Sequence, residues 1–100
     1  MLTHSVYFWL KKELTPDQIK SFEKGLRTIS EIDVVKKIEI GKPAPTVRPA
    51  VDRTYDYGIV ISLSDMDAHQ KYQDHPLHKS FLENHRSKWN KVVIYDVLND

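Results

Sequence analysis

Residues 2–10 alternate in the way that is typical of a β-strand. One face of this strand is largely apolar and consists of Leu2, His4, Val6, Phe8 and Leu10. The opposite face carries two large aromatic side chains, Tyr7 and Trp9. A strand with bulk on both faces needs two covers. Helices of the same chain can supply one cover, and a partner subunit is the simplest source of the other.

A helix is predicted over residues 16–29. Thr15 is suited to cap its N-terminus, Pro16 suits the first helical position, and Gln18 can complete a capping box. Apolar residues then recur at helical spacing and indicate one buried stripe, formed by Ile19, Phe22, Leu26 and Ile29.

Three further strands are predicted, at residues 33–40, 55–63 and 91–97. The stretch 41–54 between the first two contains three prolines, which exclude a helix or a central strand there. A solvated loop is the favoured interpretation of this stretch. A lid or binding loop is the alternative, because loops of this length are uncommon in small domains.

A second helix is predicted to be split in two by a proline. Ser64 is the expected cap at its start, and Pro76 disfavours helical geometry at His75 before a helix begins again. Tyr72 falls on the apolar stripe of the first piece, and His78 falls on the apolar side of the second.

The order of elements is therefore strand, helix, strand, strand, split helix, strand. Its simplest arrangement is an α+β, ferredoxin-like βαββαβ fold with the helices on one face of the sheet. One hundred residues fit a single domain that spans positions 1–100. The other face of the sheet is left for a partner.

Composition excludes several classes of function. The net charge is +1, so no basic field is available to attract nucleic acid or an anionic membrane surface. The chain has no cysteine, which excludes disulfides and thiolate catalysis and fits a reducing cytoplasm. No signal peptide and no apolar run near the roughly 20 residues of a membrane span is evident. A cytoplasmic location is expected.

Several motifs together resemble one known family. They are His4 on the aromatic first strand, Ile40-Gly41, Asp56-Tyr57, Tyr72-x-x-His75-Pro-x-His78-x-x-Phe81, and Tyr95-Asp96. The chain resembles the stress-responsive α/β-barrel (Dabb) family over nearly its whole length, and the Tyr-x-x-His-Pro-x-His segment is the most specific part. The resemblance implies a dimeric α/β barrel, a homodimer in which the two sheet faces meet.

The resemblance also implies a ligand site without a cofactor. The family includes proteins of unknown function, plant stress-associated proteins and a plant polyketide cyclase that uses a tyrosine and a histidine, which correspond to Tyr72 and His78. The expected lining residues of the cavity are His4, Val6, Phe8, Phe22, Leu26, Tyr57, Ile59, His75, Phe81 and Trp89. Charged Glu23 and Arg27 on the first helix do not suit a long alkyl-bearing polyketide.

Four functions follow from these residues. The leading one is binding of a small hydrophobic carbonyl compound at Tyr72 and His78. A cofactor-independent, aldol-type cyclase or lyase is the alternative, with His78 as general base and Tyr72 stabilising the developing oxygen charge. A non-catalytic stress or structural domain is the second alternative, because a tyrosine on an apolar stripe is usually part of a core. A cofactor-free monooxygenase rests on fold analogy alone.

The histidines do not predict a metal site. His75 and His78 lie three residues apart with His69 and His85 nearby, but no third ligand with suitable spacing is evident, and His75 is expected to cap a helix. Asp96 lies among apolar residues of the last strand. It is expected either to pair with an arginine across a dimer or to mark an exposed face.

Overall fold

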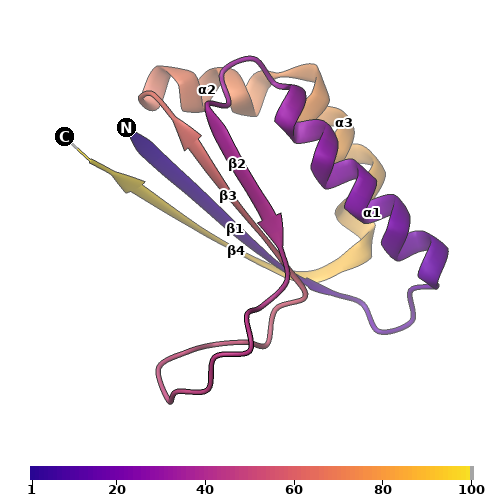
Figure 1. Cartoon of the computed structure of the whole chain (residues 1–100). Coiled ribbons are helices and arrows are strands. Elements are labelled where there is room, and N and C mark those ends of the chain that lie inside the picture. The colour runs from indigo at the N-terminus through magenta and orange to yellow at the C-terminus, as the bar shows by residue number, and fades with distance from the viewer. Residues whose placement is uncertain (100) are drawn as a thin grey trace.

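The computed structural model describes residues 1–99. Helices lie along one face of a sheet, and the opposite face is uncovered (Figure 1). The elements in chain order are β1 (Leu2–Leu10), α1 (Pro16–Thr28), the 3₁₀ turn η1 (Ile29–Glu31), β2 (Lys37–Gly41), β3 (Tyr57–Leu63), α2 (Met66–Asp74), α3 (Pro76–His85), the 3₁₀ turn η2 (Arg86–Lys88) and β4 (Trp89–Leu98). This is the α+β ferredoxin-like order that the sequence predicts, with the second helix split.

The four strands of the described chain form one antiparallel sheet in the order β2-β3-β1-β4. In this register Val6 of β1 lies opposite Ile59 of β3 and Ile94 of β4. Side chains alternate along each strand, so these three share the face that the helices cover. Every second residue of β1, beginning at Leu2, is buried. The predicted two-faced strand is therefore confirmed, and it lies at the centre of the sheet.

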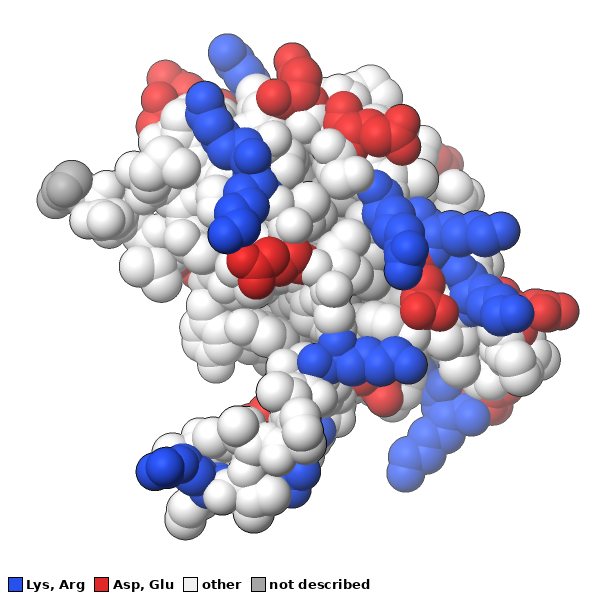
Figure 2. Space-filling model, in the orientation of Figure 1, with Lys and Arg blue, Asp and Glu red and all other residues white. Residues whose placement is uncertain are grey.

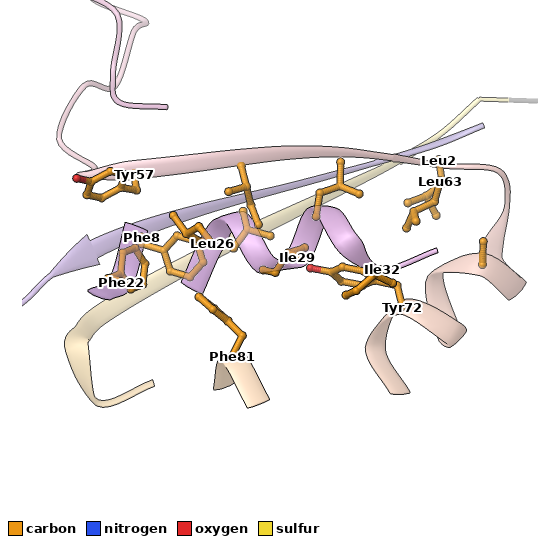
Figure 3. Close-up of a cluster of buried hydrophobic side chains, with 14 of the residues drawn as sticks. Leu2, Phe8, Phe22, Leu26, Ile29, Ile32, Tyr57, Leu63, Tyr72 and Phe81 are labelled. Atoms are coloured by element: carbon orange, nitrogen blue, oxygen red, sulfur yellow. The ribbon is translucent and has the colours of Figure 1, made fainter. Parts of the chain in front are cut away.

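The capping box of α1 forms as the sequence predicts. The Gln18 backbone N–H donates to Thr15 Oγ1 at 3.2 Å, and the Thr15 backbone N–H donates to Gln18 Oε1 at 2.8 Å. These bonds satisfy amides that have no partner within the helix. Phe22 and Leu26 of the predicted stripe are completely buried. Figure 3 shows them between the sheet and the other helices.

The strand predicted at 33–40 is wrong at its start. β2 begins only at Lys37, because the residues before it form a turn in which the Val35 N–H donates to the Ile32 carbonyl at 3.0 Å. Val34 is partly buried and packs against the core from outside the sheet.

β3 begins later than the predicted range of 55–63. The Asp56 side chain accepts a hydrogen bond from the Leu10 backbone N–H at 2.7 Å, in the place of a strand neighbour. Tyr55 then packs on the uncovered face of the sheet, where its ring centroid lies 4.9 Å from that of Tyr7.

β4 is longer than the predicted range of 91–97 at both ends. Leu10 pairs with Trp89, and Leu2 pairs with Leu98, so β4 follows the whole length of β1. The partner strand sets the length of β4, and the local alternation of its own residues does not.

The start of α2 also differs from the prediction. Asp65, and not Ser64, is its N-cap, and the Asp65 carboxylate accepts from the Ala68 backbone N–H at 2.8 Å. A carboxylate at a helix N-terminus also interacts favourably with the helix dipole.

The predicted break at Pro76 is confirmed. His75 is extended, with φ −65° and ψ 139°, and Pro76 opens α3. The Nδ1 atom of His75 accepts from the Leu77 backbone N–H at 3.1 Å, so His75 caps α3 as expected.

The segment 42–56 projects away from the end of the sheet (Figure 1). A hydrogen bond holds the end of this segment against the sheet, because Trp9 Nε1 donates to Thr54 Oγ1 at 2.9 Å.

Basic and acidic side chains are interspersed over the face shown in Figure 2, in keeping with the small net charge. In the described part of the chain, no helix is long and apolar enough to cross a membrane.

Gly25 lies where α1 meets the end of α3. A Cβ atom at this position would lie 2.4 Å from His85 Nε2 and 2.6 Å from His85 Cδ2. The His85 ring cannot easily move, because it is buried, packs beside the rings of Phe22 and Phe81, and has a hydrogen bond between its Nδ1 and Lys88 Nζ at 3.0 Å.

Gly25→Ala should therefore destabilise the fold by about 1–3 kcal/mol in urea unfolding, the typical cost of overpacking. Destabilisation is the opposite of the usual effect, because replacing glycine with alanine in the middle of a helix normally stabilises the protein by about 1 kcal/mol. In a His85→Ala background the same change should stop being destabilising. A Gly25→Ala protein as stable as the parent would contradict the close helix contact.

Candidate functional site

Tyr72 and His78 meet at the junction of α2 and α3. Their ring centroids lie 4.8 Å apart, although the two residues belong to different helices. The extended His75 backbone redirects the chain between them, which lets both side chains face the same space. The ring of His4, on β1, lies 5.4 Å from the Tyr72 ring. The helix break therefore brings these two predicted residues together.

A small cavity of about 90 Å³ lies beside this pair, between the sheet and the helices. Its lining residues are His4, Val6, Phe8, Ile29, Ile59, Tyr72, His78, Phe81, Leu82, Trp89, Val92 and Ile94. Val92 and Ile94 are exposed residues of the edge strand β4. The cavity is therefore mainly apolar, with its polar groups concentrated at one end and its walls reaching the surface beside β4.

A backbone carbonyl fixes the orientation of His78. The Nδ1 atom of the ring lies 3.2 Å from the carbonyl oxygen of Gln73. A carbonyl only accepts, so Nδ1–H is the donor and Nε2 of the neutral ring is left as an acceptor. Burial lowers the pKa of His78, against a smaller opposing effect of the Gln73 carbonyl. The ring is therefore neutral at pH 7 and can accept a hydrogen bond or a proton.

Tyr72 supplies a donor to the same cavity. Burial, together with the charge of Asp96, raises the pKa of its hydroxyl well above the ordinary value, so the group stays protonated at neutral pH. In Figure 3 the hydroxyl oxygen points toward Ile29, another lining residue. A phenol donor beside an imidazole acceptor can hold a carbonyl oxygen and accept a neighbouring proton.

The structure brings eight of the predicted site residues to this cavity, and they are His4, Val6, Phe8, Ile59, Tyr72, His78, Phe81 and Trp89. It places the other four elsewhere. Phe22 and Leu26 fill the core below the cavity, and His75 is engaged as a helix cap. Tyr57 lies against Phe22, with ring centroids 5.6 Å apart, at the far end of the core.

Tyr57 belongs to a second, larger hollow of about 570 Å³ at the base of the projecting segment. Burial and the neighbouring Glu23 carboxylate raise the pKa of Tyr57 to about 12. The ammonium group of Lys42 lies 5.6 Å from the Tyr57 ring centroid. This hollow is wider, but it does not contain the Tyr72–His78 pair.

Sequence reasoning missed four lining residues, namely Ile29, Leu82, Val92 and Ile94. Leu82 follows the apolar pattern of α3, and Val92 and Ile94 alternate along β4, so each carried a signal of burial. Their place at the cavity depends on the register of β4 against β1, which the pattern does not give.

Asp96 forms an interaction that neither sequence alternative anticipated. It lies directly opposite His4 in the β1–β4 register, and its Oδ1 atom is 2.5 Å from His4 Nδ1. A second histidine, His69 of α2, places Nε2 3.6 Å from Asp96 Oδ2. Three polar side chains from distant parts of the chain thus gather beside the cavity.

This arrangement places the chain in the class of ferredoxin-like α+β proteins, with an apolar cavity between the sheet and its helices. The profile of the Stress responsive A/B Barrel Domain (Dabb) family matches residues 2–99. The chain therefore belongs to the Dabb family, as the sequence motifs indicated.

Two enzymes are similar to this chain. It is 26% identical over 94 residues to the olivetolic acid cyclase of Cannabis sativa, a match that covers 93% of this chain and 91% of the cyclase. The hydroxynitrile lyase of Passiflora edulis has a similar structure, with a TM-score of 0.80 at 17% identity, covering 99% of this chain and 93% of the lyase.

A bacterial protein of unknown function is also similar. The dimeric ferredoxin-like protein from Thermobifida fusca superposes with a TM-score of 0.80 at 23% identity, covering 98% of this chain and 90% of that chain. These structural likenesses show the fold.

The state of His78 can be measured directly. Its ring should titrate with a midpoint below 6.5 and carry its neutral proton on Nδ1, as detected by long-range ¹H–¹⁵N NMR correlations. Because the unfolded histidine takes up a proton first, His78 should contribute a loss of stability as the pH falls through about 6.5. A midpoint above 6.5, or a proton on Nε2, would contradict this geometry.

Proposed function

We propose that this protein binds a small, mainly apolar carbonyl compound in the cavity beside Tyr72 and His78. The observation that carries the proposal is the pairing of a protonated phenol and a neutral imidazole at the end of an apolar cavity, with their ring centroids 4.8 Å apart. The phenol can donate to the carbonyl oxygen. The apolar walls can cover the rest of the compound.

The size of the cavity restricts the ligand. Drug-sized ligands occupy pockets of about 300–1,000 Å³, whereas this cavity measures about 90 Å³. The walls include large rings at Phe8, Phe81 and Trp89, which fill the space that a long chain would need. A compact ketone or aldehyde fits this volume better than a long alkyl-bearing polyketide.

Lyase chemistry at the same residues is the second candidate. His78 Nε2 would remove the proton next to the carbonyl, the electron pair would move onto the carbonyl oxygen, and Tyr72 would donate a hydrogen bond to that oxygen. The enolate carbon would then form a bond to a second carbonyl carbon, and the oxygen of that carbonyl would take up the proton from His78 Nε2. The fixed Nδ1–H of His78 favours this role, because it leaves Nε2 free as a base. The name of one similar protein, the olivetolic acid cyclase, is in keeping with such chemistry.

Binding can be tested with cyclohexanone as the probe. Its saturable binding should shift the methyl NMR signals of the lining residues Ile29 and Ile59. Tyr72→Phe should weaken binding about 3–10-fold, the value of one hydrogen bond. Lys79→Ala, an exposed neighbour on α3, is the matched control and should bind normally.

A matched ligand separates recognition of the oxygen from simple cavity filling. Methylenecyclohexane has a similar shape but no oxygen, so it should bind more weakly than cyclohexanone, and Tyr72→Phe should abolish the difference. Equal binding of the two compounds would contradict carbonyl recognition. Absence of binding by both would favour the non-catalytic structural alternative.

We also propose that the protein forms a homodimer through the uncovered faces of its sheets. On this face the rings of Tyr7, Trp9 and Tyr55 pack against one another, with centroid distances of 4.9 Å and 6.2 Å. Tyr95 and Val97 of β4 extend the patch, and each is 62% exposed. The similar protein from Thermobifida fusca is dimeric, which supports a second copy as the cover.

Val97→Lys should therefore raise the dimer dissociation constant at least about tenfold, because it places a charge in an apolar contact. The control is Leu98→Lys, since Leu98 is 55% exposed but its side chain lies on the opposite face of the sheet. Native mass spectrometry over a concentration series measures both. Equal effects of the two changes, or a monomeric parent protein, would contradict dimerisation through this face.

A further inference from the structure

We propose that His4, His69 and Asp96 form a binding site for a divalent transition-metal ion such as Zn²⁺ or Co²⁺. This cluster adjoins the Tyr72–His78 pair, because His4 also lines the cavity, but the proposal does not depend on what the cavity binds. It is carried by the convergence of two imidazole nitrogens and a carboxylate. Each of the three residues offers one ligand atom, and these atoms all lie within 4.8 Å of one another.

Three different elements hold the cluster. His4 and Asp96 face each other directly across β1 and β4, 92 positions apart in the chain. His69 comes from α2, and its ring centroid lies 5.2 Å from that of His4 in an edge-to-face arrangement. Paired strands and a packed helix fix these positions, so the ligands are placed by rigid elements and not by a mobile loop.

His69 provides the second, independent observation. Its side chain is buried, and its Nε2 atom has no hydrogen-bond partner within residues 1–99. Asp96 Oδ2 is 3.6 Å from this atom, which is too long for a hydrogen bond. Buried polar atoms nearly always have a partner, so an unpaired nitrogen that faces a carboxylate indicates an occupant of the space between them.

The Asp96 side chain would have to rotate, and the cluster to close from its present span of up to 4.8 Å, for all three ligands to bind one ion. Metal–ligand bonds of about 2.0–2.1 Å place neighbouring ligand atoms about 3.3 Å apart in tetrahedral geometry. Asp96 Oδ2 lies 3.6 Å from His69 Nε2, and Asp96 Oδ1 lies 2.5 Å from His4 Nδ1. Asp96 can open the shorter contact by rotating its side chain, which is 40% exposed. The ion would replace the proton that His4 Nδ1 shares with Asp96.

The ligand set defines the class of metal. Imidazole nitrogens favour zinc, cobalt, nickel and copper over calcium and magnesium, which prefer oxygen ligands. One carboxylate balances part of the charge of a divalent ion. Because Asp96 reaches the surface, water can complete the coordination sphere. Three protein ligands with an open position are also the arrangement of many metal sites that exchange ligands.

Isothermal titration of the tag-free, metal-stripped protein with Zn²⁺ tests the proposal. One Zn²⁺ should bind per chain. His69→Gln and Asp96→Asn should each weaken binding at least about tenfold, because each removes one of three ligands. The matched control is His75→Asn, which removes an imidazole but keeps a good helix-capping side chain, and it should leave the zinc affinity unchanged.

A measurement on the unmutated protein guards against variants that fold poorly. Co²⁺ should shift and broaden the NMR signals of the His4 and His69 rings strongly, and those of the His75 ring only weakly. Zinc binding that survives His69→Gln, or cobalt effects centred on His75, would overturn the proposal. So would the absence of saturable binding at millimolar Zn²⁺, which would leave a bridging water as the partner of His69 Nε2.

Discussion

The rest of the structure depends on β1, an inner strand that pairs with β3 over residues 2–8 and with β4 over residues 2–10. Its inner face carries His4, Val6 and Phe8 into the cavity and the core, and its outer face carries Tyr7 and Trp9. Both faces of β1 carry large apolar side chains, which are shielded from water only when both faces are covered. The helices cover one, and the proposed second copy covers the other.

The helix break at His75 and Pro76 provides the second constraint. An uninterrupted helix would continue the direction of α2 and could not turn the ring of His78 back onto that of Tyr72. The break costs little, because His75 caps the new helix and Pro76 suits its first position. The carbonyl of Gln73, left at the end of α2, then fixes the His78 ring. This one break in the helix thus supplies the carbonyl that orients the His78 ring and leaves Nε2 of that ring as a hydrogen-bond acceptor.

The inner face of the sheet combines two kinds of environment. Toward Phe8 and Trp89 it is apolar and closely packed, whereas around His4 and Asp96 it is polar and reaches the surface. The charge of Asp96 acts on both, since it bonds to His4 and contributes to the raised pKa of Tyr72. The cavity and the histidine cluster are therefore adjacent sites that share one electrostatic neighbour.

The sequence by itself determined the order of the elements, the capped start of α1, the break at Pro76 and the two-faced character of β1. These depend on side-chain periodicity and on the backbone preferences of proline and capping residues, which act over a few positions. It also identified Tyr72 and His78 as a pair, through a motif that spans a single helix junction.

Tertiary structure alone decided where β2 and β3 begin, how far β4 extends, and which side chains reach the cavity. The Asp56 carboxylate ends one ladder by binding the Leu10 amide, a partner 46 positions away. Asp96 meets His4 only because β4 pairs with β1 in one register, and a shift by one residue would turn its side chain to the other face. Such contacts depend on strand register and helix packing across the whole chain, which no local pattern of residues contains.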